Sequence, residues 1–206
     1  MRGVSIEIAD GWVDLYRLKT PAGLVALTHG AGGAVSTDDV LAVRDALLDA
    51  GVAVALVTQP YRVAGRRTPP APGPQDTAWA AVIAGLRKRR GLRVLPLFLG
   101  GRSNGARVAC RTADGLGAVG VVALAYPLHP PGKPENSRLG ELEAPSCPVL
   151  VVQGDRDPFG MPPPGAGRTI EIIAGADHNL RKDTARLAEL VVQFVTSTLA
   201  RASLAE

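Results

Sequence analysis

The segment LPLFLGGRSNGARVA, Leu95–Ala109, gives the clearest indication of the fold class. Its first half is almost entirely apolar and ends at two glycines, which predicts a short buried strand with Pro96 at its first position. A helix is predicted to begin directly after Ser103. The turn between them, GRSNG (residues 101–105), matches the G-x-S-x-G pattern that holds a serine on a sharp strand-to-helix turn. Its glycines leave room for strained backbone, and the helix N-terminus favours negative charge beside the hydroxyl.

Short apolar runs alternate with helix-like segments on both sides of this stretch. Further strands are predicted at LVALTHG (24–30), VAVALVTQP (52–60), AVGVVALAYPL (118–128), PVLVVQG (148–154) and TIEIIAG (169–175). Helices are predicted at about 38–50, 77–90 and 181–200, besides the one after Ser103. VSIEIA and WVDLYRL predict a leading antiparallel hairpin that turns at Asp10-Gly11. Such alternation predicts an α/β fold with a mostly parallel central sheet and helices on both faces. Since no repeat or linker divides the chain, residues 1–206 are expected to form one domain.

Composition favours an ordinary globular protein, with 46% hydrophobic and 20% charged residues. The first residues lack a signal-peptide pattern, and the longest apolar runs are only strand-sized. We therefore expect a cytoplasmic protein that does not engage membranes. Two cysteines, Cys110 and Cys147, are too few for a disulfide framework, and both are expected to be reduced and buried.

The net charge of +4 and the isoelectric point near 9.4 raise the question of nucleic-acid binding. However, the arginines are scattered, and the densest basic run, residues 87–90, falls at the C-terminal end of a predicted helix. Cations there complement the helix dipole. Aromatic residues make up only 4% of the chain, too few to stack bases. No nucleic-acid partner is expected.

A second glycine-rich motif, THGAGG (residues 28–33), directly follows a predicted strand. Its small residues would let the loop pass close to Ser103 and offer backbone N–H groups to an oxyanion. The two donors are assigned to Ala31 and Asn104, with Gly32 as the alternative for the first. A phosphate-binding loop is disfavoured because the motif lacks Gly-Lys-Ser/Thr and does not match G-x-G-x-x-G.

An acidic group and a base follow the two last predicted strands. GDRDPF (residues 154–159) offers two aspartates, and Asp157 is favoured over Asp155 because Pro158 holds it rigidly. Asp155 could instead brace the turn. Among the three histidines, only His178 completes the order Ser, Asp, His along the chain. His29 is expected to brace the glycine-rich loop, and His129 to line the mouth of the site.

The motifs LTHGAGG, GGRSNGARVA, VVQGDRDPFG and GADHNL together resemble the α/β-hydrolase superfamily, most closely its compact, dienelactone-hydrolase-like members. The resemblance implies a serine hydrolase that needs neither cofactor nor metal. It implies Ser103, Asp157 and His178 as the catalytic triad, and small esters or thioesters as substrates that pass through an acyl-enzyme. Dienelactone hydrolases use a cysteine where this chain has serine, so their substrate does not carry over. The short segment after the sixth predicted strand implies a minimal cap.

Several further residues fall near the predicted rim of the site. Substrate contacts are predicted for Gly32, Tyr61, Arg62, Arg102 and His129. With Arg66 and Arg67, these arginines could favour anionic substrates, although solvated loop arginines are the simpler interpretation. The alternative to an enzyme is a catalytically inactive binding or scaffold protein on the same fold. A homodimer, through an edge strand or the final helix, stays open.

Overall fold

The computed structural model describes residues 3–204 and consists of a central sheet between two helical layers. The strands are β1 (Val4–Ile8), β2 (Gly11–Tyr16), β3 (Leu24–Thr28), β4 (Ala53–Thr58), β5 (Leu97–Arg102), β6 (Ala118–Leu124), β7 (Val149–Gly154) and β8 (Arg168–Ile173). The helices are α1 (Asp38–Asp49), α2 (Pro60–Val63), α3 (Pro72–Arg87), α4 (Asn104–Thr112), α5 (Leu139–Leu142) and α6 (Thr184–Ser203).

The eight strands lie in the order β1-β2-β4-β3-β5-β6-β7-β8. The pairings β1–β2 and β2–β4 are antiparallel, and all other pairings are parallel. This is the mostly parallel sheet that the apolar strands predicted. The leading hairpin is also present, but its turn is formed by Ala9 and Asp10, one residue earlier than expected. Both residues have positive φ, the conformation of a two-residue turn that matches strand twist.

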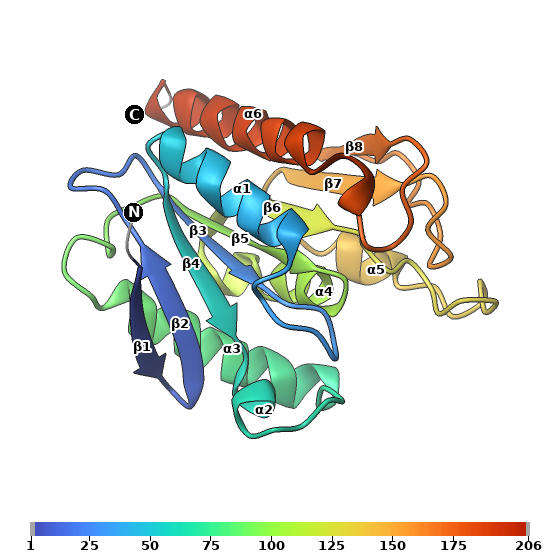
Figure 1. Cartoon of the computed structure of the whole chain (residues 1–206), viewed down its shortest axis with the longest axis horizontal. Helices are drawn as coiled ribbons and strands as arrows, with labels where there is room; N and C mark the ends of the chain where they lie inside the picture. The colour runs from blue at the N-terminus through green and yellow to red at the C-terminus, as the bar shows by residue number, and fades with distance from the viewer. Residues whose placement is uncertain (1–2, 205–206) are drawn as a thin grey trace.

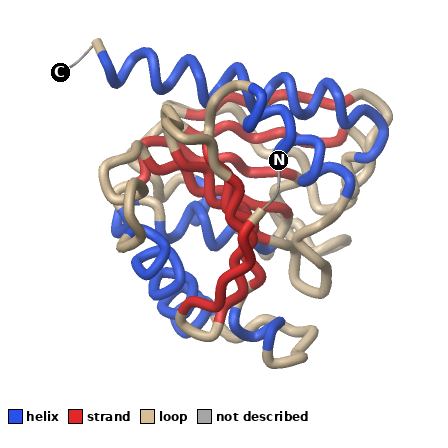
Figure 2. The backbone as a smooth tube through the Cα atoms, turned by 60° about the vertical axis from the view of Figure 1, so that its left-hand side comes forward, coloured by secondary structure: helices blue, strands red, loops and turns tan. Residues whose placement is uncertain are grey.

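Each face of the sheet is covered by helices (Figures 1 and 2). On one face α1 and α6 lie side by side. Their fully buried side chains, such as Val43 and Leu47 of α1 and Val191 of α6, belong to the core on this face. On the other face α3, α4 and α5 bury a second core that includes Trp79 and Ile83. Burial on both faces explains why the central strands have no polar alternation.

Some boundaries differ from the sequence prediction. Helix α3 begins at Pro72 rather than near Thr77, because prolines are compatible with a first helical turn whose N–H groups have no intrahelical partner. It ends at Arg87, so most of the basic run lies beyond the helix. Cys110 is buried as expected, whereas Cys147 is only partly buried, and both are free thiols.

The topology brings the glycine-rich loop and the serine turn together. Strands β3 and β5 are parallel neighbours, with Thr28 in register with Gly101, so the segments that follow them leave the sheet side by side. Between β6 and β7 the chain carries only the short helix α5, which leaves a minimal cap. Among the described helices, none is both long and apolar enough to cross a membrane.

Candidate active site

Ser103 occupies a strained turn between β5 and α4. Its φ of 54° and ψ of −115° lie outside the regions that non-glycine residues favour. Its N–H donates to Leu124 O at 2.8 Å, which anchors the turn to β6. The flanking glycines are required sterically, since a Cβ at Gly101 would lie 2.6 Å from Thr28 O and one at Gly105 would lie 2.8 Å from the same atom. The sequence pattern thus encodes close packing of the turn against β3.

Three side chains from three strand ends meet at this turn. The Oγ atom of Ser103 lies 2.9 Å from Nε2 of His178, and Nδ1 of His178 lies 2.8 Å from Oδ2 of Asp157. Asp157 follows β7 and His178 follows β8, so only their loops bring them back over β5. The side chain of Asp157 is fully buried, whereas that of His178 is 18% exposed. The carboxylate of Asp157 is therefore shielded from solvent, while the imidazole of His178 remains partly accessible.

The hydrogen-bond network assigns the tautomer of His178. Both oxygens of Asp157 act as acceptors, because Oδ2 also accepts from Gln153 Nε2 at 2.9 Å and Oδ1 accepts from the N–H of Phe159 at 2.9 Å. His178 Nδ1 must then carry the proton that it donates to Asp157. Its Nε2 is left as an acceptor for the hydroxyl of Ser103, the arrangement that a general base requires.

One aromatic ring packs against His178, and Asp155 braces the loop that carries this histidine. The ring of Phe159 lies against the ring of His178, with centroids 4.2 Å apart and planes tilted by 31°. Asp155, the alternative acid, accepts from the N–H of Gly175 at 2.7 Å and so braces the turn after β8. In this geometry Asp157, and not Asp155, contacts the imidazole.

A buried set of hydrogen bonds holds the glycine-rich loop beside the serine. His29 accepts at Nε2 from the N–H of Gln59 at 3.0 Å, so its Nδ1 carries a proton and donates to Gly30 O at 2.8 Å. The hydroxyl of Tyr61 donates to Ala31 O at 2.7 Å. A Cβ at Gly30 would lie 3.4 Å from the Cβ of Ser103, which shows how closely the loop approaches the turn.

Two residues that were predicted to contact substrate make hydrogen bonds within the protein, to the loops around Ser103. Tyr61 is only 2% exposed, because its ring lies behind the loop that its hydroxyl supports. Burial raises the pKa of Tyr61 to about 12, so it remains a neutral donor. Arg102 lies beside the serine, but its Nη2 donates to His178 O and to Asn179 Oδ1, both at 2.8 Å. It therefore fastens the histidine loop to the turn rather than facing the solvent as a free cation.

Arg102 also has an acidic partner that sequence reasoning missed. Its Nε lies 3.2 Å from Oδ2 of Asp39, whose side chain is 1% exposed. Asp39 belongs to the first turn of α1, where acids also favour the helix dipole. No sequence pattern connects the two residues, which lie far apart along the chain.

The other predicted contact residues lie around the loop ends. Arg62 is partly buried and donates to Arg66 O at 3.1 Å. Its positive charge contributes to lowering the pKa of His29. Gly32 is exposed, and the nearest atom to a Cβ there would be Arg67 O at 3.9 Å. The ring of His129 lies against Gly160, and its backbone N–H donates to Phe159 O at 3.0 Å.

The two residues predicted to donate to an oxyanion lie at the first residue of α4 and on the loop after β3. Asn104 is the first residue of α4, where the backbone N–H has no intrahelical acceptor, and it is 7% exposed. Ala31 is exposed on the loop after β3. Among the described residues no cluster of histidine, cysteine and acidic side chains could hold a metal ion.

Gln153 and Gln59 are the main site residues that sequence reasoning did not identify. Gln153 donates through Nε2 toward Asp157, Tyr126 O at 3.1 Å and Gly160 O at 3.0 Å. It is fully buried on β7, and a glutamine inside an otherwise apolar run, PVLVVQG, was the available signal. Buried polar side chains need partners, so such a residue at a strand's carboxyl end indicates a local polar network.

His29 makes the stability of the protein depend on pH. Burial lowers the pKa of His29 below its ordinary value of 6.5, and the charge of Arg62 lowers it further. Above pH 6.5 both folded and unfolded chains hold this ring neutral. Below pH 6.5 only the unfolded chain gains the proton, so the free energy of unfolding should fall as the pH decreases toward the lowered pKa, by up to about 1.4 kcal/mol per pH unit.

Urea unfolding of the wild type and of His29→Asn between pH 5 and 8 checks this expectation. The variant should be less stable than the wild type at pH 8, and the difference should shrink toward pH 5. A constant difference across this range would show that His29 does not remain neutral in the folded state.

The sequence matches the family model of the alpha/beta hydrolase domain over residues 21–198. Because this match covers most of the chain, the protein belongs to the alpha/beta hydrolase family. No match is found among curated proteins.

Solved structures agree in fold. Est1E from Butyrivibrio proteoclasticus with ferulic acid bound superposes with a TM-score of 0.74 at 17% identity, over 96% of this chain and 99% of that chain. Dienelactone hydrolase from Anabaena variabilis superposes with a TM-score of 0.70 at 18% identity, over 97% of this chain and 96% of that chain. XC6422 from Xanthomonas campestris, a serine hydrolase without a lid, superposes with a TM-score of 0.70 at 18% identity, over 96% of this chain and 95% of that chain. At these identities the likeness concerns the fold alone.

Proposed function

We propose that the protein is a serine hydrolase that acts on small esters or thioesters through an acyl-enzyme. The observation that supports this most strongly is the continuous chain of hydrogen bonds from Asp157 through His178 to Ser103. A scaffold protein that had lost its chemistry would have no need to keep a serine in a strained turn with a base at hydrogen-bond distance.

The geometry supports a two-step acyl transfer. His178 Nε2 takes the proton of Ser103 as the hydroxyl oxygen attacks the substrate carbonyl. Asp157 stabilises the imidazolium that forms, and the N–H groups of Ala31 and Asn104 stabilise the oxyanion. His178 then returns the proton to the leaving alcohol or thiol. Water, activated by the same base, attacks the acyl-enzyme and releases the acid and the free serine.

The minimal cap favours short acyl groups. With only α5 between β6 and β7, the described chain has little structure that could enclose a long aliphatic chain. We therefore propose p-nitrophenyl acetate, the corresponding thioester, and an ester of ferulic acid, the compound bound by Est1E, as first substrates. Comparing the rates for an anionic and a neutral ester of similar size tests whether Arg62, Arg66 and Arg67 favour negatively charged substrates. If they do, Arg62→Ala should lower the ratio of the anionic to the neutral rate.

Labelling with a fluorophosphonate probe tests the proposal. We expect the wild type to be labelled at Ser103 and Ser103→Ala to remain unlabelled, because only an activated serine attacks such a probe. Mass spectrometry of the labelled peptide identifies the residue. If neither this probe nor a smaller phosphonate labels the folded wild type, the inactive scaffold becomes the better description.

A further inference from the structure

A small cavity lies at the end of the sheet opposite to the candidate active site. It has a volume of about 250 Å³ and is lined at the first residues of β7 and β8, Val149 and Arg168. The candidate active site lies beyond the carboxyl ends of these same parallel strands. Six residues of extended chain separate the two ends by roughly 20 Å. The cavity is therefore not part of the site described above.

The guanidinium of Arg168 is the principal polar group in this cavity. Its side chain is only 4% exposed, although it carries a full positive charge. A Cβ at Gly165 would lie 2.8 Å from Cζ of Arg168, so the guanidinium lies directly against the glycine backbone. Nε donates to Pro163 O at 3.0 Å, which holds the group in one orientation.

Most of the hydrogen-bonding capacity of this arginine is unused. A guanidinium has five N–H donors, yet within residues 3–204 Arg168 side-chain nitrogens make only the bond to Pro163. Within residues 3–204 the one acidic side chain that forms an ion pair with it, Glu143, lies 3.8 Å from Nη2 and is 55% exposed. At this separation, and with the carboxylate in contact with solvent, the pair stabilises little. Nη1 and Nη2 therefore have no hydrogen-bond acceptor among the described residues, so an anionic ligand in the cavity could accept from them.

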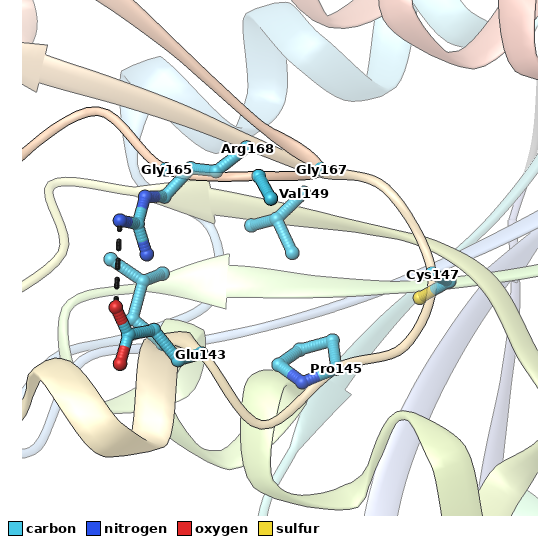
Figure 3. A pocket seen from close by; sticks show the side chains of 9 residues that line it. Glu143, Pro145, Cys147, Val149, Gly165, Gly167 and Arg168 are labelled. Atoms are coloured by element: carbon cyan, nitrogen blue, oxygen red, sulfur yellow. Dashed lines mark ion pairs between the residues drawn. The ribbon is translucent and has the colours of Figure 1, made fainter.

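Apart from Arg168 and Glu143, the side chains that line the cavity are aliphatic or, at Cys147, a thiol. Figure 3 shows the guanidinium and Glu143 on one side, Cys147 on the opposite side, and Pro145 and Val149 between them. A ligand with one charged end and a short apolar body would satisfy both parts of this lining. A carboxylate suits the charged end, since its two oxygens match the planar fork of a guanidinium.

We infer that this cavity is a binding site for a small monocarboxylate, whose carboxylate pairs with Arg168 and whose apolar body lies against Pro145 and Val149. Glu143 competes for the same nitrogens and moves toward solvent when the ligand enters. This inference stands on its own and does not depend on the proposed hydrolase activity.

Titration of the full chain with sodium benzoate, followed by amide NMR, tests the inference. We expect saturable shifts at residues 165–168 and at Cys147, and no comparable shifts with neutral benzamide. Saturable shifts confined to residues around Ser103, or equal binding of benzamide, would overturn the proposal.

Two charge variants make the test independent of any single substitution. Arg168→Lys keeps the charge but loses the two-pronged geometry, and should weaken benzoate binding about tenfold. Glu143→Gln removes the competing carboxylate at an exposed position, and should tighten binding severalfold. Should Arg168→Lys fail to fold, Glu143→Gln decides the matter, because unchanged or weaker benzoate affinity in that variant contradicts the inferred site.

Discussion

Replacing His178 by alanine is expected to lower kcat for a short ester by a factor on the order of 10⁴ to 10⁶. Its Nε2 is the only base at hydrogen-bond distance from Ser103 Oγ within the described chain, at 2.9 Å. Without it, the hydroxyl loses its proton acceptor and the leaving group loses its proton donor. Because the two residues act as one unit, Ser103→Ala combined with His178→Ala should be hardly slower than either single variant.

Steady-state kinetics with p-nitrophenyl acetate check this expectation, with circular dichroism to show that the variants fold. Asp157→Asn should also lose activity by a factor of about 10⁴, because the amide would favour the wrong tautomer of His178. Asp155→Asn is the matched comparison, since within residues 3–204 the carboxylate of Asp155 accepts only from the N–H of Gly175. A larger loss in Asp155→Asn than in Asp157→Asn would reverse the assignment of the acid.

Replacing Gly101 by alanine is expected to destabilise the protein by about 3 kcal/mol or more. The added Cβ would lie 2.6 Å from Thr28 O and 2.9 Å from the carbonyl carbon of Gly105. Both neighbours are backbone atoms held by β3 and α4, so neither can move aside without breaking strand pairing or the serine turn. Any folded fraction should be inactive, because the clash would displace Ser103.

Gly73→Ala is the matched control. Gly73 lies in the first turn of α3, and a Cβ there would meet no atom within 4 Å. That substitution should leave the free energy of unfolding unchanged or raise it slightly, because alanine favours helix. Equal stability of Gly101→Ala and Gly73→Ala in urea unfolding would refute the proposed role of close packing at the turn.

The fold could be predicted from the sequence because its signals are local. Apolar runs of strand length alternate with helical segments, and burial on both faces of the sheet produces that pattern directly. The serine turn was predictable because its G-x-S-x-G pattern lies within five consecutive residues, although the contacts that require Gly101 and Gly105 are made with Thr28 on β3. The start of α3 was not predictable, because prolines fit both a loop and a first helical turn.

The contacts of the residues around Ser103, His178 and Asp157 could not be predicted in this way. Arg102 and Tyr61 look like members of a substrate mouth when only their positions along the chain are known. In the structure, the guanidinium of Arg102 donates to the backbone carbonyl of His178, and the hydroxyl of Tyr61 donates to that of Ala31. Which backbone group a long side chain meets depends on strands and loops that are distant in sequence.

The alternation of strands and helices, the serine turn and the order of Ser103, Asp157 and His178 along the chain can all be recognised from the amino-acid sequence. These depend on steric and hydrophobic preferences that each segment carries within itself. The folded chain was needed to show that Asp157 rather than Asp155 contacts His178, that Gln153 and Gln59 support the site, and that Arg168 is buried beside a cavity. Hydrogen bonds and buried charges depend on distances between atoms of separate segments, which exist only after the sheet has assembled.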